Sequence, residues 1–121
     1  MLNNKPNGRS VLLAMALAIS TSAVFADNCG EIPQAPELVN GASATMEELV
    51  ANSESVKAYI ASADTFLDCR DAYAKTEEFK GLNQSEQKAL IETSNELLGK
   101  RNAIGDDFNK EVAAFKAANP Q

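Results

Sequence analysis

Apolar residues between Thr45 and Phe79 recur with the period of one long amphipathic α-helix. Three rows at seven-residue spacing lie next to one another on a helix of about 3.6 residues per turn, so together they form one broad apolar stripe. Thr45 and Glu48 have the spacing of a capping box, and Gly81 suits a left-handed residue after the last turn. We therefore predict a first helix over residues 46–79. Its apolar rows are Leu49, Val56 and Ala63; Ile60, Leu67 and Ala74; and Tyr59, Phe66 and Tyr73.

A second helix is predicted over residues 84–118, with Asn83 as its N-cap and a proline shortly beyond its end. Gly99 and Gly105 interrupt its apolar row, yet the three- and four-residue spacing continues through both glycines. We therefore expect one continuous or bent helix, with a break at the glycines as the alternative. The apolar row is Leu90, Leu97, Ile104, Phe108 and Phe115, flanked by Ile91, Leu98 and Val112.

A short turn at Leu82–Asn83 joins the two predicted helices, so they fold back on each other. The expected fold class is all-α: an antiparallel two-helix hairpin of long helices with coiled-coil spacing. Such a hairpin has a thin core and leaves one side of each stripe exposed. The exposed stripe indicates either a dimer that closes into a four-helix bundle or a surface for another protein.

Residues 27–44 have no helical period, and Pro33 and Pro36 favour an extended backbone there. Apolar side chains are nevertheless present in this segment. We therefore interpret it as a strap that runs back along the first helix and covers part of the stripe. Its apolar residues are Ile32, Leu38 and Val39.

The chain has two cysteines, Cys29 and Cys69, and the first lies in the predicted strap. Two cysteines in an exported chain usually form one disulfide, because the compartment beyond the membrane is oxidising. A Cys29–Cys69 bridge would close a loop of about 40 residues and contribute on the order of 4 kcal/mol in the chain-entropy model. Free or intermolecular thiols are the alternative.

Residues 1–26 have the three parts of a secretory signal peptide. Lys5 and Arg9 give a positive start, Val11–Ile19 is an apolar run, and Ala26 ends a cleavage site of small residues. The apolar run is about half as long as a bilayer-spanning helix, which argues against a retained membrane anchor. We expect the rest of the chain, the strap and a hairpin over residues 45–121, to be one domain in the periplasm of a Gram-negative bacterium.

The chain is acidic, with 11 basic and 17 acidic residues and a formal net charge of −6. Loss of Lys5 and Arg9 with the predicted signal peptide leaves 9 basic residues and a net charge of −8. A negative surface argues against nucleic acid and anionic membranes as partners. It would suit a cationic partner, although acidity also serves solubility.

No histidine occurs in the sequence. The commonest general base and metal ligand is therefore lacking, as are Ser-His-Asp and Cys-His arrangements and the Glu-x-x-His pairs of di-iron bundles. Asp64, Asp68 and Asp71 follow one side of the first helix about one turn apart, which is too far for a single cation. We expect no metal, no cofactor and no catalytic activity.

Arg70 and Arg101 each fall in an apolar row of their helix. In hairpin register Arg70 faces the region of Glu92 and Glu96, and Arg101 approaches Ser62 and Asp64. One interpretation is a site for an anionic ligand between the helices. The favoured interpretation is an interhelical ion pair or a side chain at the edge of the stripe.

Tyr59, Phe66 and Tyr73 form an aromatic row at the edge of the first helix's stripe. Such a row can serve as a contact surface for a partner helix or for segments of unfolded proteins. Packing in the core is the favoured interpretation, because aromatic side chains bury a large apolar area.

Six short stretches from Cys29 onward resemble segments of known proteins. They are E-L-V-N-G at 37–41, A-T-M-E-E-L-V at 44–50, V-K-A-Y-I at 56–60, F-L-D-C at 66–69, E-Q-K-A-L at 86–90 and D-D-F-N-K-E-V-A-A-F-K at 106–116. They are similar to small exported helical proteins of Gram-negative bacteria, and the resemblance implies an exported, cysteine-linked helical fold without an assigned activity. Residues 82–87 also partly match the Leu-Thr-x-x-Gln motif of Spy-like periplasmic chaperones, but they lack the threonine and have an extra residue before the glutamine.

These observations favour a non-enzymatic exported protein that acts by contact, as an adaptor or a chaperone-like module. Its partner would be another protein or a second copy of itself. An alternative is a carrier of a small ligand or anion, with Arg70 and Arg101 between the helices. A weaker alternative, based on net charge alone, is an acidic inhibitor of a cationic secreted enzyme.

Overall fold

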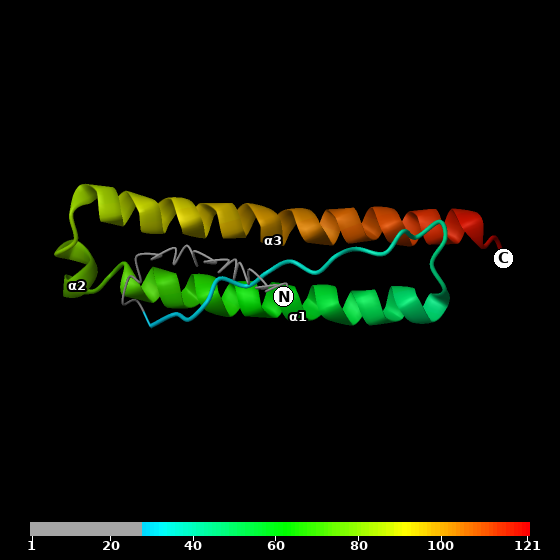
Figure 1. The fold of residues 1–121 in the computed structure, drawn as a ribbon, viewed down its shortest axis with the longest axis horizontal. Coiled ribbons are helices and arrows are strands. Elements are labelled where there is room, and N and C mark those ends of the chain that lie inside the picture. Colours follow the sequence, from blue (N-terminus) through cyan, green and yellow to red (C-terminus); the bar gives the residue numbers. More distant parts are fainter. Residues whose placement is uncertain (1–27) are drawn as a thin grey trace, which may run out of the picture.

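The computed structural model describes residues 28–121, and every regular element in that range is a helix (Figure 1). The helices are α1 (Met46–Tyr73), α2 (Glu77–Lys80) and α3 (Gln84–Ala118). The expectation of an all-α chain is confirmed. The predicted signal peptide, residues 1–26, lies outside the described residues.

Helices α1 and α3 lie side by side and run in opposite directions, with α2 at the end where the chain turns back (Figure 1). Their apolar stripes face each other, so the core forms along the contact. Ala63 is fully buried and Leu97 is 2% exposed, which makes the middle of the contact its most closed part. The buried apolar residues are Leu49, Val56, Tyr59, Ala63, Phe66, Leu90, Leu97 and Ile104.

Helix α1 begins as predicted but ends earlier. Thr45 accepts a hydrogen bond from the Glu48 N–H, and the Glu48 carboxylate accepts one from the Thr45 N–H, which completes the predicted capping box. The prediction of a helix continuing to residue 79 is wrong, because Thr76 interrupts it. The Thr76 hydroxyl donates to the Tyr73 carbonyl (2.6 Å) and accepts from the Phe79 N–H (3.3 Å), so Thr76 is the N-cap of the separate helix α2.

The turn between α2 and α3 needs no left-handed residue. Gly81 has φ of −77°, in the right-handed region, so the predicted left-handed position is wrong. The Gly81 N–H donates to the Glu77 carbonyl (3.0 Å) and the Leu82 N–H to the Phe79 carbonyl (3.1 Å), which closes the turn with helix-like bonds. The rings of Tyr73 and Phe79 meet edge to face at 5.8 Å and join α2 to the end of α1.

Helix α3 is continuous and passes through both Gly99 and Gly105. The expectation of a single helix is therefore confirmed. Each glycine costs about 1 kcal/mol relative to alanine in a helix, a cost that the packing of α3 against α1 outweighs. The start is fixed by a second capping box, in which Asn83 accepts from the Glu86 N–H (2.9 Å) and Glu86 accepts from the Asn83 N–H (3.0 Å).

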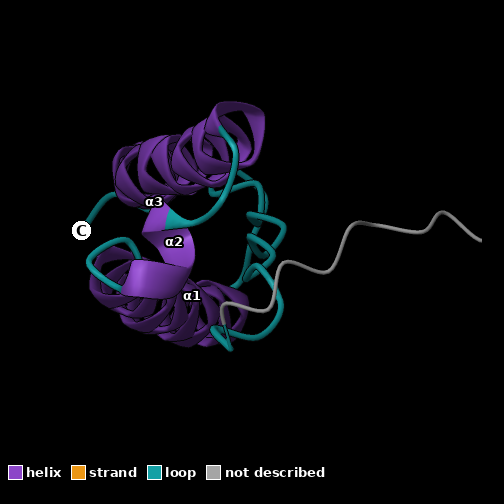
Figure 2. Ribbon diagram, turned by 90° about the vertical axis from the view of Figure 1, so that its left-hand side faces the viewer, coloured by secondary structure: helices purple, strands orange, loops and turns teal. Residues whose placement is uncertain are grey.

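Residues 28–45, here called the N-terminal segment, run along one side of the α1–α3 pair (Figures 1 and 2). Figure 2 looks along the two helices and shows this segment as a teal loop beside both of them. Cys29 is joined to Cys69 of α1 with a Cα–Cα distance of 5.6 Å, so the predicted disulfide is confirmed. Leu38 packs against the buried core from the same side. The N-terminal segment therefore adds apolar cover that two helices alone would lack.

Two further contacts fix the N-terminal segment to the helices. The buried Asn52 side chain of α1 accepts from the Val39 N–H (3.1 Å) and donates to the Glu37 carbonyl (2.9 Å). The Gly41 N–H donates to a carboxylate oxygen of Glu111 in α3 (2.6 Å). A Cβ atom at Gly41 would collide with the backbone of Glu111, so this close approach needs a glycine. The segment is thus anchored to both long helices.

Replacing Asn52 by alanine should lower the free energy of unfolding of the oxidised protein by about 1–3 kcal/mol, because the Val39 N–H and the Glu37 carbonyl lose their buried partner. Urea unfolding measures the loss, and amide exchange of Val39 should accelerate. The control is Thr65→Ala on the exposed surface of α1, which should cost no more than about 0.5 kcal/mol. Equal effects of the two substitutions would contradict the anchoring role of Asn52.

Candidate interaction surface

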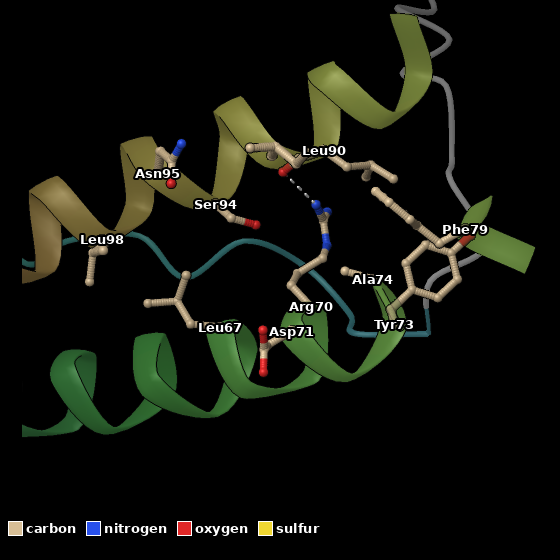
Figure 3. A pocket seen from close by; sticks show the side chains of 11 residues that line it. Leu67, Arg70, Asp71, Tyr73, Ala74, Phe79, Leu90, Ser94, Asn95 and Leu98 are labelled. Atoms are coloured by element: carbon tan, nitrogen blue, oxygen red, sulfur yellow. Dashed lines mark hydrogen bonds between the residues drawn. The ribbon is translucent and has the colours of Figure 1, made fainter. Parts of the chain in front are cut away.

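The two sides of the α1–α3 pair differ in how they are covered. The N-terminal segment covers one side (Figure 2). On the other side, here called the open side, a groove of about 250 Å³ lies between the helices near α2 (Figure 3). It is lined by Leu67, Arg70, Asp71, Tyr73, Ala74, Phe79, Leu90, Ile91, Ser94, Asn95 and Leu98.

Arg70 crosses the groove from α1 toward α3 (Figure 3). Its Nη1 donates to the Leu90 carbonyl at 3.4 Å, and its guanidinium lies 4.9 Å from the centre of the Phe66 ring. The expected approach to Glu92 and Glu96 is not observed. Those carboxylates pair along α3 itself, with lysines one helical turn away, because they lie on another face of the helix.

Arg101 of α3 forms a bidentate ion pair with Asp64 of α1 on the open side. The Arg101 Nε donates to Asp64 Oδ1 at 2.8 Å and the Nη2 donates to Oδ2 at 3.0 Å, so the expected approach to Asp64 is observed. The other expected neighbour, Ser62, instead lies beside Glu31 and Pro33 of the N-terminal segment. The hydrogen bonds from Arg101 lower the pKa of Asp64, and those same bonds raise the pKa of Arg101. The guanidinium fork is therefore occupied by a carboxylate of the protein itself.

The predicted aromatic row is divided between the core and the groove. Tyr59 and Phe66 are 5% and 3% exposed, so both pack in the core and neither is available as a contact surface in this structure. Tyr73 is half-buried and lines the groove beside Phe79 (Figure 3). Only this last member of the row lies at the open side.

The large apolar side chains exposed at the groove come from α3. Ile91 is 50% exposed and Leu98 is 45% exposed, although both lie beside the core row. Ile91 and Leu98 were predicted to flank the core row and were given no functional role. The missed signal is that Asn95, which lies about one helical turn from both residues along the exposed edge of the helix, carries no charge.

A line of uncharged residues follows the outer edge of α3 on the open side, and we call it the neutral stripe. Its members are all at least partly exposed. The charged residues of α3 on other faces pair with one another, as in Lys100–Glu96 (2.9 Å) and Lys110–Asp107 (3.0 Å). The neutral stripe is Ile91, Asn95, Leu98, Asn102, Gly105 and Asn109.

Within residues 28–121 no group of three or more acidic or cysteine side chains is arranged to hold a metal ion. Asp64 is paired with Arg101, and Asp71 is paired with Lys75 at 3.0 Å. None of the three helices is both long enough and apolar enough to cross a membrane.

Comparisons with protein-family models, with curated proteins and with solved structures give no match to this chain. Its function must therefore be inferred from the exposed surface and from the chemistry of the side chains on it. The open side has an apolar groove, half-exposed aliphatic side chains and the ion pair between Arg101 and Asp64. These features suit contact with another apolar surface.

Replacing Arg101 by glutamine should raise the pKa of Asp64 toward its ordinary value of 3.8, because the carboxylate loses the hydrogen bonds and the positive charge that lower it. The ion pair stabilises the folded protein at pH values above the ordinary pKa of Asp64. This contribution is lost as the pH falls through the lowered pKa that Asp64 has in the folded protein. Carboxyl NMR titration measures the shift. The control Lys75→Gln removes the partner of Asp71 and should leave the pKa of Asp64 unchanged. If Asp64 has the same pKa in Arg101→Gln as in the wild type, the pairing is refuted.

Proposed function

We propose that this protein is a non-enzymatic, exported interaction module that binds a partner protein at its open side. In this proposal the chain works as an antiparallel two-helix hairpin, and the N-terminal segment is a strap that seals the opposite side. The observation that carries the proposal is the pair of half-exposed side chains, Ile91 and Leu98, at the mouth of an apolar groove.

The physical argument rests on the cost of exposed apolar surface. Burial of apolar area contributes about 25 cal/mol per Å², so a partner that covers Ile91 and Leu98 gains free energy from both. The groove between two helices can accept the apolar face of a third helix, a common mode of peptide recognition. Arg70, Ser94 and Asn95 at its walls add polar groups that can orient such a partner.

The proposed location is the periplasm of a Gram-negative bacterium. The disulfide between Cys29 and Cys69 supports an oxidising compartment, because such bonds are rare where thiols are kept reduced. The sequence of the first 26 residues supports export for an independent reason, since it has the pattern of a cleaved signal peptide.

The proposed absence of catalysis rests on the composition of the chain. Without histidine, proton transfer near neutral pH would need a carboxylate whose pKa is raised, whereas the hydrogen bonds from Arg101 lower the pKa of Asp64. The anion-carrier alternative is less well supported, because Arg101 is held by Asp64 and Arg70 contacts Leu90 and Phe66. The inhibitor alternative still depends on net charge alone.

Either Ile91→Glu or Leu98→Glu should abolish partner binding, because a charge at the centre of an apolar contact is desolvated without compensation. The measurement is capture of the tagged protein from intact, crosslinked periplasm, with bound proteins identified by mass spectrometry. One stoichiometric partner would make the protein an adaptor, and many substoichiometric clients would make it a chaperone.

The matched control is Ile32→Glu, which makes the same chemical change at an exposed isoleucine of the N-terminal segment. It should keep every partner that the wild type captures. Partners that survive Ile91→Glu and Leu98→Glu but are lost in Ile32→Glu would place the binding surface on the strapped side and overturn the proposal.

A further inference from the structure

We infer that the N-terminal segment is a redox-controlled strap made of two halves. Reduction of the Cys29–Cys69 disulfide releases the first half, residues 28–36, whereas the second half, residues 37–45, stays docked on the helices. The release uncovers aromatic side chains of α1 on the covered side of the helix pair. The inference goes beyond the proposed function, because that function concerns the open side.

The second half of the segment is held by contacts that reduction leaves intact. The Asn52 side chain of α1 binds the Val39 N–H and the Glu37 carbonyl. The buried Gly41 donates from its N–H to Glu111 of α3, and Figure 1 shows this half crossing from α1 to α3. These bonds connect the second half to both long helices, and none of them involves sulfur.

The first half of the segment has no comparable hydrogen bonds. Within the described part of the chain, residues 30–36 form none to a helix, and the Gln34 side chain donates to the Ile32 carbonyl inside the segment itself (3.2 Å). Pro33 and Pro36 have no N–H to donate. The disulfide is the covalent link that fixes the far end of this half to α1.

Hollows lie between the first half and α1. One of about 350 Å³ is lined by Pro33 and Phe66, and another of about 500 Å³ is lined by Pro36 and Tyr59. Incomplete packing means that burial returns little free energy for the loss of conformational entropy in an extended segment. Once the covalent link is cut, the entropy gained on release therefore outweighs the contacts that are lost.

The first half covers two aromatic side chains of α1. Tyr59 and Phe66 are 5% and 3% exposed, and both belong to the buried core while they line the hollows beneath the segment. The buried Tyr59 hydroxyl has no hydrogen-bond partner among residues 28–121, so water admitted by the release satisfies it. Reduction thus gives the covered side an apolar surface that the oxidised protein lacks.

The reductant that fits this switch is a dithiol. Cys29 and Cys69 are both half-buried and each lines a hollow at the surface, so a thiolate can approach the bond. It attacks one of the two sulfurs, the S–S bond breaks, and the other sulfur leaves as a thiolate that takes up a proton. The second thiol of the reductant then resolves the mixed disulfide. The protein gains two electrons and two protons, and the reductant is left as a disulfide.

The experiment is NMR of the protein expressed from the full sequence and purified after export, before and after reduction by dithiothreitol. The backbone order parameters of Ile32 and Gln34 should fall from about 0.85 to below about 0.6, while that of Val39 stays near its oxidised value. With a soluble gadolinium chelate present, broadening of the Phe66 ring signals should increase severalfold on reduction. The methyl signals of Leu97 should stay protected, because the contact between α1 and α3 persists.

The matched control is the double variant Cys29→Ser, Cys69→Ser. It should show the mobile first half and the exposed Phe66 ring without reductant, and dithiothreitol should change nothing further. Order at Ile32 and Gln34 that survives reduction of the wild type would overturn the inference. So would loss of order at Val39, which would mean release of the whole segment, or broadening of Leu97, which would mean that the helix pair itself opens.

Discussion

Two helices packed side by side can bury only the part of each apolar stripe that faces the other, and here the stripes are broader than that contact. This constraint accounts for the rest of the structure. On one side the N-terminal segment supplies the missing cover, with Leu38 packed against the core. On the open side the described residues supply none, and Ile91 and Leu98 stay half-exposed around the groove. The unequal cover of the two sides is the basis of the proposed function.

The N-terminal segment can act as cover because it is held at several independent points. The Cys29–Cys69 disulfide limits the freedom of the unfolded chain and keeps the segment beside α1. The Asn52 amide fixes its register with two hydrogen bonds, and Gly41 brings it into contact with Glu111 of α3. An extended segment without such anchors would gain too little from burial to offset its loss of conformational entropy.

Local chemistry made the helices and both capping boxes predictable from the sequence, because each depends on residue types at short spacing. The disulfide was predictable for another reason, since the chain has two cysteines and the pattern of an exported protein. The break at Thr76 was missed since the apolar period continues past it, whereas a capping hydroxyl decides the local backbone. Register across the helix pair was predictable only within about one turn, so Arg101 was placed beside Asp64 correctly and Arg70 was not. The neutral stripe was not predicted, because apolar periodicity identifies the buried face of a helix and says little about the edge of that face.

The N-terminal segment covers apolar core residues on one side of the helix pair, while Ile91 and Leu98 stay half-exposed on the other. The most direct test is methyl NMR of the dilute, oxidised protein in the presence of a soluble paramagnetic agent that broadens solvent-exposed groups. The account predicts strong broadening of the methyl signals of Ile91 and Leu98 and weak broadening of those of Leu38. Equal broadening of all three, or protection of Ile91 and Leu98 in the monomer, would contradict it.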